Sequence, residues 1–187
     1  WESLVNRRMY VSGGIGANPA VEGFGGDYEL PNAGAYAETC AAVGSVLWNH
    51  RMGLLFGEAR FMDVAELTLY NGFLSGVSLS GNTFFYVNPL ESDGGHRRAD
   101  WFTVACCPMN ASRLLASLGG LIYAAGPDEL FVNLFVSSTV EQTFETGATL
   151  TLSQVARFPW EERVRLSIEE LSAPAEDGAD ELAVSVR

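Results

Sequence analysis

A change in hydrophobic pattern at Gly126-Pro127 most strongly constrains how this 187-residue chain can fold. Before it, apolar residues recur at helical spacing, and the clearest stripe consists of Leu114, Leu115, Leu118, Leu121 and Ile122. After it, short strand-like runs alternate with turn residues or acidic residues, at 130–136, 148–152, 164–168 and 182–186. The pattern predicts an α+β chain whose second part is an antiparallel β-sandwich segment, with a domain boundary between residues 126 and 127.

Punctuation by glycine and proline indicates where the elements of the chain begin and end. The predicted helices span 2–10, 40–56, 59–74 and 108–124, and a glycine-rich loop covers 11–34. A hairpin is predicted around Ser80-Gly81-Asn82, between the apolar runs 77–79 and 84–87. The acidic segment 174–180 predicts an exposed loop. The helical part thus leads, and the strands follow.

The charge of the chain excludes two classes of partner. The sequence carries 23 acidic residues against 11 basic ones, for a net charge of −12. Such a chain is repelled by nucleic acids and by anionic membrane surfaces. No segment offers the roughly eighteen consecutive apolar residues that a membrane helix requires. We therefore expect neither nucleic acid nor membrane as a partner, and a hydrophobic content of 48% predicts a globular fold.

The chain contains three cysteines, Cys40, Cys106 and Cys107, and Glu38 lies close to the first of them. Three thiols and a carboxylate are a donor set that zinc accepts in tetrahedral coordination. The pairs Glu-x-Cys and Cys-Cys differ from the Cys-x-x-Cys knuckles of zinc fingers. This unusual pairing indicates a site assembled for chemistry rather than for stapling a small fold.

Local geometry predicts where these residues lie. Residues two apart do not share a face of a helix, so Glu38 and Cys40 should straddle a helix start, with Thr39 as the N-cap. Pro108 suits the first turn of the later helix and places Cys107 at or beside its cap. The partial positive charge of a helix N-terminus favours thiolate over thiol. Both groups of cysteines should therefore lie at helix starts.

Two other interpretations of the cysteines stay open at this point. Buried cysteines commonly act as small apolar residues in helix packing. Alternatively, Cys106 and Cys107 form a vicinal redox pair. A disulfide between adjacent residues closes a strained ring, and the chain has no Cys-x-x-Cys motif.

A series of short motifs follows in one order between about residues 6 and 138. They are Tyr10–Gly16, Glu22–Phe24, Asp27–Asn32, Ala35–Ala42, Leu69–Gly72, Phe85–Leu90 and Cys106–Asn110. Together they resemble glycoside hydrolase family 127, the beta-L-arabinofuranosidase-like enzymes. The resemblance implies that residues 1–126 are the C-terminal portion of an (α/α)6-barrel catalytic domain, and that residues 127–187 begin a β-sandwich domain.

The resemblance also implies a mechanism and a cofactor. The parent protein would be an exo-acting retaining glycosidase with Cys106 as nucleophile and Glu22 as general acid and base. Zn²⁺ would be bound by Glu38, Cys40, Cys106 and Cys107. Binding to zinc deprotonates a sulfur at neutral pH and fixes its direction, although it also lowers its nucleophilicity. Without the resemblance, Glu22 would be interpreted as an ordinary exposed carboxylate of a loop.

Two further residues carry over from the resemblance with less weight. Tyr86 and Glu66 are similar to family residues that hold the hydroxyls of the sugar. From pattern alone, Tyr86 could equally be a strand residue that alternates between core and surface. Glu66 could equally belong to a solvated helix face.

The implied partner is an arabinose-containing oligosaccharide or glycoconjugate, and assembly into a homo-oligomer is left open. Because the chain begins at Trp1 without an initiator methionine, we expect a piece of a longer protein that is incomplete for activity alone. The need for reduced thiols favours a cytoplasmic parent. The alternative function is a non-catalytic zinc-binding or carbohydrate-binding remnant of the same fold.

Overall fold

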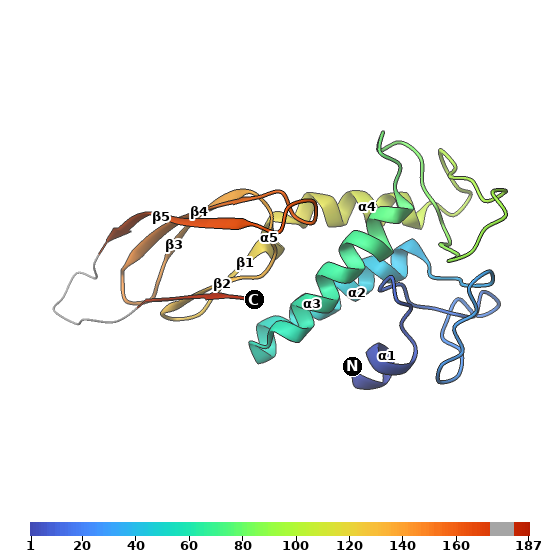
Figure 1. Cartoon of the computed structure of the whole chain (residues 1–187), viewed down its shortest axis with the longest axis horizontal. Coiled ribbons are helices and arrows are strands. Elements are labelled where there is room, and N and C mark those ends of the chain that lie inside the picture. The colour runs from blue at the N-terminus through green and yellow to red at the C-terminus, as the bar shows by residue number, and fades with distance from the viewer. Residues whose placement is uncertain (173–181) are drawn as a thin grey trace. The chain divides into compact units, whose positions relative to one another are not determined.

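The computed structural model describes residues 1–172 and 182–187, so the loop predicted at 174–180 lies outside the described residues. The chain divides into two compact units, Trp1–Ala116 and Ser117–Arg187. The first unit contains the long helices and the second contains the strands (Figure 1). The predicted α+β class is confirmed.

The two compact units meet between Ala116 and Ser117, which is nearer the N-terminus than the domain boundary predicted between residues 126 and 127. The short helix α5 (Gly119–Ile122) and the strand β1 (Tyr123–Ala125) contact one another, and β1 pairs with β2 of the second unit. The backbone N–H of Asn133 also donates to the carbonyl of Ile122 at 2.8 Å. The domain boundary itself stays a prediction.

The first unit is built around two long helices and several extended loops. Its α-helices are α1 (Glu2–Arg7), α2 (Thr39–Phe56), α3 (Ala59–Leu67) and α4 (Cys106–Ser117). Helix α2 ends as predicted, because Gly57 adopts the left-handed conformation and its N–H bonds to the carbonyl of Gly53. None of the helices in the described part of the chain is long and apolar enough to cross a membrane.

Helix α3 does not continue as the single regular helix predicted for 59–74. It passes into a π-helix, Thr68–Phe73, and then a 3-10 turn, Leu74–Gly76. The π-helix lies against the loop before α2, where the buried Thr68 hydroxyl donates to the carbonyl of Gly13 at 3.2 Å. Wide turns of this kind are rare and are often found at functional sites.

The segment between η2 and α4 lacks regular structure. The predicted hairpin is reduced to a single antiparallel bridge between Val77 and Phe84, and Phe84 forms a second bridge with Ala99. The predicted turn is present, because Gly81 has a positive φ of 74° and the N–H of Ser78 bonds to the carbonyl of Thr83. This long connection leads the chain back to the cysteine pair.

The helix predicted over 108–124 is divided into α4, α5 and the start of β1. Leu114, Leu121 and Ile122 of the predicted apolar stripe are buried, whereas Leu115 is 46% exposed. The interruption lies beside Gly119-Gly120, two residues that stabilise a helix poorly. The apolar stripe therefore predicts some of the buried positions correctly, but the helix predicted from it is too long.

The described residues of the second unit form two three-stranded sheets. One has the order β1-β2-β6, from Tyr123–Ala125, Glu129–Val132 and Ala183–Val186. The other has the order β3-β4-β5, from Ser138–Thr143, Thr149–Ala156 and Val164–Ser172. Strands β2 and β6 pair in parallel, which departs from the antiparallel arrangement predicted, while the other named pairs in the described residues are antiparallel.

The core of the second unit is apolar and formed by alternating residues of β2 and β4 together with Phe144, which directly follows β3. Its buried members are Leu130, Val132, Phe144, Leu150 and Leu152. The polar side chain of Gln154 is also buried, and its amide donates to the carbonyl of Leu134 at 3.0 Å. Strand β3, with the sequence STVEQT, was not predicted because it has few apolar residues.

Gly13 is expected to be far less tolerant of a side chain than Gly57. Both have a positive φ, of 80° and 66°, but a Cβ at Gly13 would lie 2.8 Å from the Cα of Thr68, while Gly57 has open space. We expect Gly13→Ala to lower the free energy of unfolding by about 2–4 kcal/mol and Gly57→Ala by about 1 kcal/mol. Chemical denaturation measures both. Equal losses would show that the loop does not need its close approach to Thr68.

Candidate metal centre

The starts of helices α2 and α4 supply four donor groups to one point. Glu38 is the N-cap residue of α2, with φ and ψ of −60° and 139°, and Cys40 lies in the first turn. Cys106 and Cys107 open α4. The ligand atoms of these four residues all lie within 4.8 Å of one another. The prediction that Glu38 and Cys40 straddle a helix start is confirmed.

One detail of the predicted helix start is wrong. Thr39 was expected to be the N-cap, but it is the first helical residue and is fully buried. Its hydroxyl donates to the carbonyl of Phe85 at 2.8 Å instead of capping the helix. Tertiary contact therefore overrides the local capping preference of threonine.

The spacing of the donors fits tetrahedral coordination. Zinc with Zn–S bonds of about 2.3 Å holds its sulfur ligands about 3.8 Å apart, and sulfur and oxygen about 3.5 Å apart. The Cys107 Sγ lies 3.4 Å from the Cys40 Sγ and 3.9 Å from the Cys106 Sγ. Glu38 Oε1 lies 3.5 Å and 3.6 Å from the sulfurs of Cys106 and Cys107. This donor set and spacing are suited to a single ion of that size.

Burial separates the three thiols into an inner and an outer group. Cys107 is fully buried, whereas Cys40 and Cys106 are half-buried. Burial raises the pKa of the Cys40 thiol to about 12, although the amide of Asn110 acts in the opposite direction. Burial, and then the neighbouring Cys40, raises the pKa of Cys107. This direction is opposite to the helix-dipole effect, so a cation is needed to hold both sulfurs as thiolates at neutral pH.

Two neighbouring side chains contact the sulfurs directly. The amide of Asn110 donates to the Cys40 Sγ at 3.1 Å, and the Tyr86 Oη lies 3.2 Å from the Cys106 Sγ. The pKa of Tyr86 is raised by its hydrogen bond with Cys106 and then by burial. The sequence placed Asn110 in a motif without a role, although its position four residues after Cys106 puts both on one helix face.

Glu22 lies in an exposed loop, as the composition of residues 11–34 predicted. Its backbone has a φ of 49°, uncommon for a residue with a side chain, and a bridge between Asn18 and Gly23 closes the loop beside it. Burial raises the pKa of Tyr36, and the carboxylates of Glu22 and Glu38 raise it further. Both carboxylates therefore influence the ionisation of the same buried hydroxyl, while the role of Glu22 as general acid and base stays a prediction.

The structure excludes two of the alternative interpretations. Glu66 is only 8% exposed, in the last turn of α3, so it does not belong to a solvated helix face. Tyr86 lies in a bend rather than a strand, and its hydroxyl points at the cysteine cluster. Contact of either residue with a sugar stays a prediction.

Comparison with known proteins identifies relatives over most of the chain. The catalytic domain family of glycoside hydrolase family 127 beta-L-arabinofuranosidases matches residues 1–120. A non-reducing end beta-L-arabinofuranosidase of Bifidobacterium longum subsp. longum is 38% identical over 96% of this chain, which covers 28% of that relative. The chain therefore spans less than a third of the length of this relative.

Two solved structures have the same fold. A family 127 beta-arabinofuranosidase is 49% identical, with a TM-score of 0.87 over 90% of this chain and 26% of its own. A family 127 beta-L-arabinofuranosidase of Geobacillus stearothermophilus T6 is 41% identical, with a TM-score of 0.85 over 90% of this chain and 28% of its own. The similarity thus includes both sequence and backbone.

Replacing one sulfur should remove the metal. We expect about one zinc ion per chain in the full-length protein and its loss in Cys40→Ser, because a hydroxyl is a far poorer zinc ligand than a thiolate. Met109 lies beside the cysteine pair in α4 but is 63% exposed, so Met109→Ser is the matched control and should keep its zinc. Elemental analysis measures the content, and full retention by Cys40→Ser would rule out the four-donor site.

The affinity for zinc should increase with pH. The raised pKa values of Cys40 and Cys107 keep both thiols protonated through the neutral range, so each must release its proton on binding. We expect the association constant to increase by about tenfold per pH unit for each proton released. Chelator competition between pH 6 and pH 8.5 measures this slope. A constant affinity above pH 7 would show that the thiols are already ionised.

Proposed function

The chain belongs to glycoside hydrolase family 127, and from this we propose that it carries the catalytic centre of a retaining, exo-acting beta-L-arabinofuranosidase. The substrate is an arabinose-containing oligosaccharide or glycoconjugate with the sugar at its non-reducing end. The names of the relatives support this choice of sugar. Because the chain spans 26–28% of those relatives, the activity is proposed for the full-length protein.

The observation that carries the proposal is the position of Cys106. It is the first residue of α4, is half-buried, and belongs to the cluster formed with Glu38, Cys40 and Cys107. Cys107 is fully buried and cannot reach a substrate. Cys106 therefore combines a contact with the cluster and an approach from outside, which a nucleophile needs.

When bound to the four donors, zinc supplies the positive charge that keeps the sulfur of Cys106 ionised at neutral pH. Tyr86 is placed to assist, because its hydroxyl lies 3.2 Å from that sulfur. When the sulfur is a thiolate, the Tyr86 hydroxyl donates a hydrogen bond to it, which stabilises its negative charge and restricts its orientation. Glu38, Cys40 and Cys107 have no role in proton transfer in this proposal.

The reaction proceeds in two displacements. The Cys106 sulfur attacks the anomeric carbon, the bond to the leaving oxygen breaks, and Glu22 gives that oxygen its proton. Glu22, now a carboxylate, then takes a proton from water as the water oxygen attacks the same carbon. The carbon–sulfur bond breaks and the thiolate is restored. The net change is the addition of one water across the glycosidic bond, with retained configuration.

Two substitutions separate the roles of the catalytic residues. In the full-length protein, Cys106→Ser should reduce hydrolysis of an aryl beta-L-arabinofuranoside by about 10⁴-fold or more, because the nucleophile is lost. Glu22→Gln should reduce kcat by about 10²–10⁴-fold for a poor leaving group. For a nitrophenyl leaving group, Glu22→Gln should reduce the rate of the first displacement less, because this leaving group departs without needing a proton.

Glu91→Gln is the control for Glu22→Gln, because Glu91 is another exposed acid of the first unit. It should leave the rate unchanged. Mass spectrometry of protein quenched during turnover should find one glycosyl adduct on the 106–107 peptide. Full activity in Cys106→Ser would eliminate the nucleophile. An inactive full-length protein that still binds zinc and arabinosides would favour the non-catalytic remnant.

A further inference from the structure

We propose that Asn88 is a positioning residue of the metal centre. Its side-chain amide holds a strained backbone turn at Ala37 and thereby fixes the direction of Glu38. The inference rests on the proposed metal site and assigns a role to a residue that the sequence left without one. It concerns geometry within this chain and does not depend on which sugar is cleaved.

The turn before Glu38 is strained. Ala37 has a φ of 36°, a region that residues with a side chain rarely adopt, and it is 3% exposed. A backbone held in such a region costs about 1–3 kcal/mol and persists only where its surroundings enforce it. The strained residue directly precedes the only carboxylate of the four-donor cluster. Any relaxation of Ala37 therefore changes where Glu38 points.

The amide of Asn88 bonds on both sides of Glu38. Its Nδ2 lies 2.9 Å from the carbonyl oxygen of Ala37 and 3.1 Å from the Thr39 Oγ1. An amide nitrogen has two hydrogens, so it can donate to both oxygens at once. The residue that carries the carboxylate is thus held between two fixed neighbours.

The backbone around Asn88 continues the same contact. The N–H of Asn88 donates to the carbonyl of Tyr36 at 3.2 Å, and the N–H of Thr39 donates to the carbonyl of Tyr86 at 3.0 Å. Segments 36–39 and 85–88 are therefore hydrogen-bonded at several points. The first segment aims Glu38 at the cluster, and the second aims the Tyr86 hydroxyl at Cys106. Two side chains join the segments, because the Thr39 hydroxyl donates to the carbonyl of Phe85 and the Asn88 amide donates to both Ala37 and Thr39.

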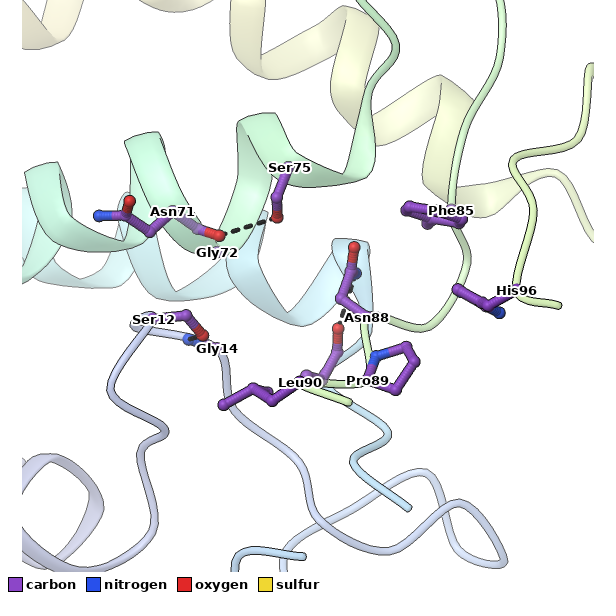
Figure 2. A pocket seen from close by; sticks show the side chains of 11 residues that line it. Ser12, Gly14, Asn71, Gly72, Ser75, Phe85, Asn88, Pro89, Leu90 and His96 are labelled. Atoms are coloured by element: carbon purple, nitrogen blue, oxygen red, sulfur yellow. Dashed lines mark hydrogen bonds between the residues drawn. The ribbon is translucent and has the colours of Figure 1, made fainter. Parts of the chain in front are cut away.

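Figure 2 shows Asn88 at the wall of a cavity of about 200 Å³, which Phe85 and Gly14 also line. Its Oδ1 is buried without a hydrogen-bond partner among the described residues. Exchanging Oδ1 and Nδ2 would set an oxygen against two acceptors, the carbonyl of Ala37 and the Thr39 hydroxyl oxygen. The contacts therefore select the donor end of the amide.

The test compares two asparagines on the wall of this cavity. Asn88→Ala removes both donations beside Glu38, whereas Asn71→Ala removes a similar bond, from Asn71 Nδ2 to the carbonyl of Leu67 at 3.3 Å. Both variants are made in the full-length protein. Zinc affinity is measured by chelator competition and global stability by thermal unfolding. The protein is also loaded with Co²⁺, whose d–d bands report ligand identity and geometry and whose charge-transfer bands report thiolate ligands.

We expect Asn88→Ala to bind zinc about 10–100-fold more weakly, the usual effect of removing a group that orients a metal ligand. The d–d bands of Co²⁺ should shift as the Glu38 oxygen moves, while the thiolate charge-transfer bands persist. Asn71→Ala should match the wild type in affinity and spectrum. If Asn88→Ala does not fold, Asn88→Ser replaces it in the same measurements, because the serine side chain is too short to reach both oxygens.

The outcomes separate this inference from the proposed function. If the wild-type protein binds no zinc and no Co²⁺, the metal site itself is wrong and the proposal for Asn88 fails with it. If the wild type binds metal and a folded Asn88 variant keeps its affinity within about twofold and its d–d bands unchanged, Asn88 has only a structural role. A change of the same size in Asn71→Ala would also overturn the proposal, because the effect would then not be specific to the turn at Glu38.

Discussion

Two helices begin at the same place in the first unit, and the rest of the candidate site depends on that constraint. Helix α2 begins at Thr39 and helix α4 at Cys106, far apart in sequence. Their starts supply a carboxylate and three sulfurs within 4.8 Å of one another. Ionised carboxylate and thiolate groups this close repel one another, and burial raises the free energy of their charged forms. A divalent cation would offset both effects, which is why this arrangement indicates a metal site rather than ordinary core packing.

The irregular parts of the first unit are as important as its helices. The loop before α2 packs on the π-helix that follows α3 through Gly13 and Thr68. The segment 85–88 packs on the turn before α2 through Asn88 and the carbonyls of Phe85 and Tyr86. A turn with a strained residue at Ala37 is maintained by these contacts rather than by its own propensity.

In the proposed site the sulfurs have two tasks. Cys107 is buried and would only bind the ion, while Cys106 is half-buried, contacts a tyrosine hydroxyl and would also attack the sugar. This division explains why two adjacent cysteines are useful in one site. A redox pair would leave Glu38 and Cys40 without a function, whereas a four-donor site uses both. The second unit, with its own apolar core, contributes none of these donors.

The sequence by itself determined the class of fold, the position of α2 and its end at Gly57, and the four side chains that form the candidate metal cluster, because these follow from periodicity, glycine conformation and donor chemistry. It also determined that Glu38 and Cys40 flank a helix start, since their spacing allows no common helix face. The π-helix, the division of the helix after Cys106, and the parallel pairing of β2 with β6 were not predictable in this way. Each depends on contacts between residues distant in sequence. The same is true of Thr39, which bonds to Phe85 instead of capping α2, and of Asn88, whose amide reaches across to Ala37. Only the tertiary structure decided these roles, because a side chain with several acceptable partners bonds to the one that folding brings within reach.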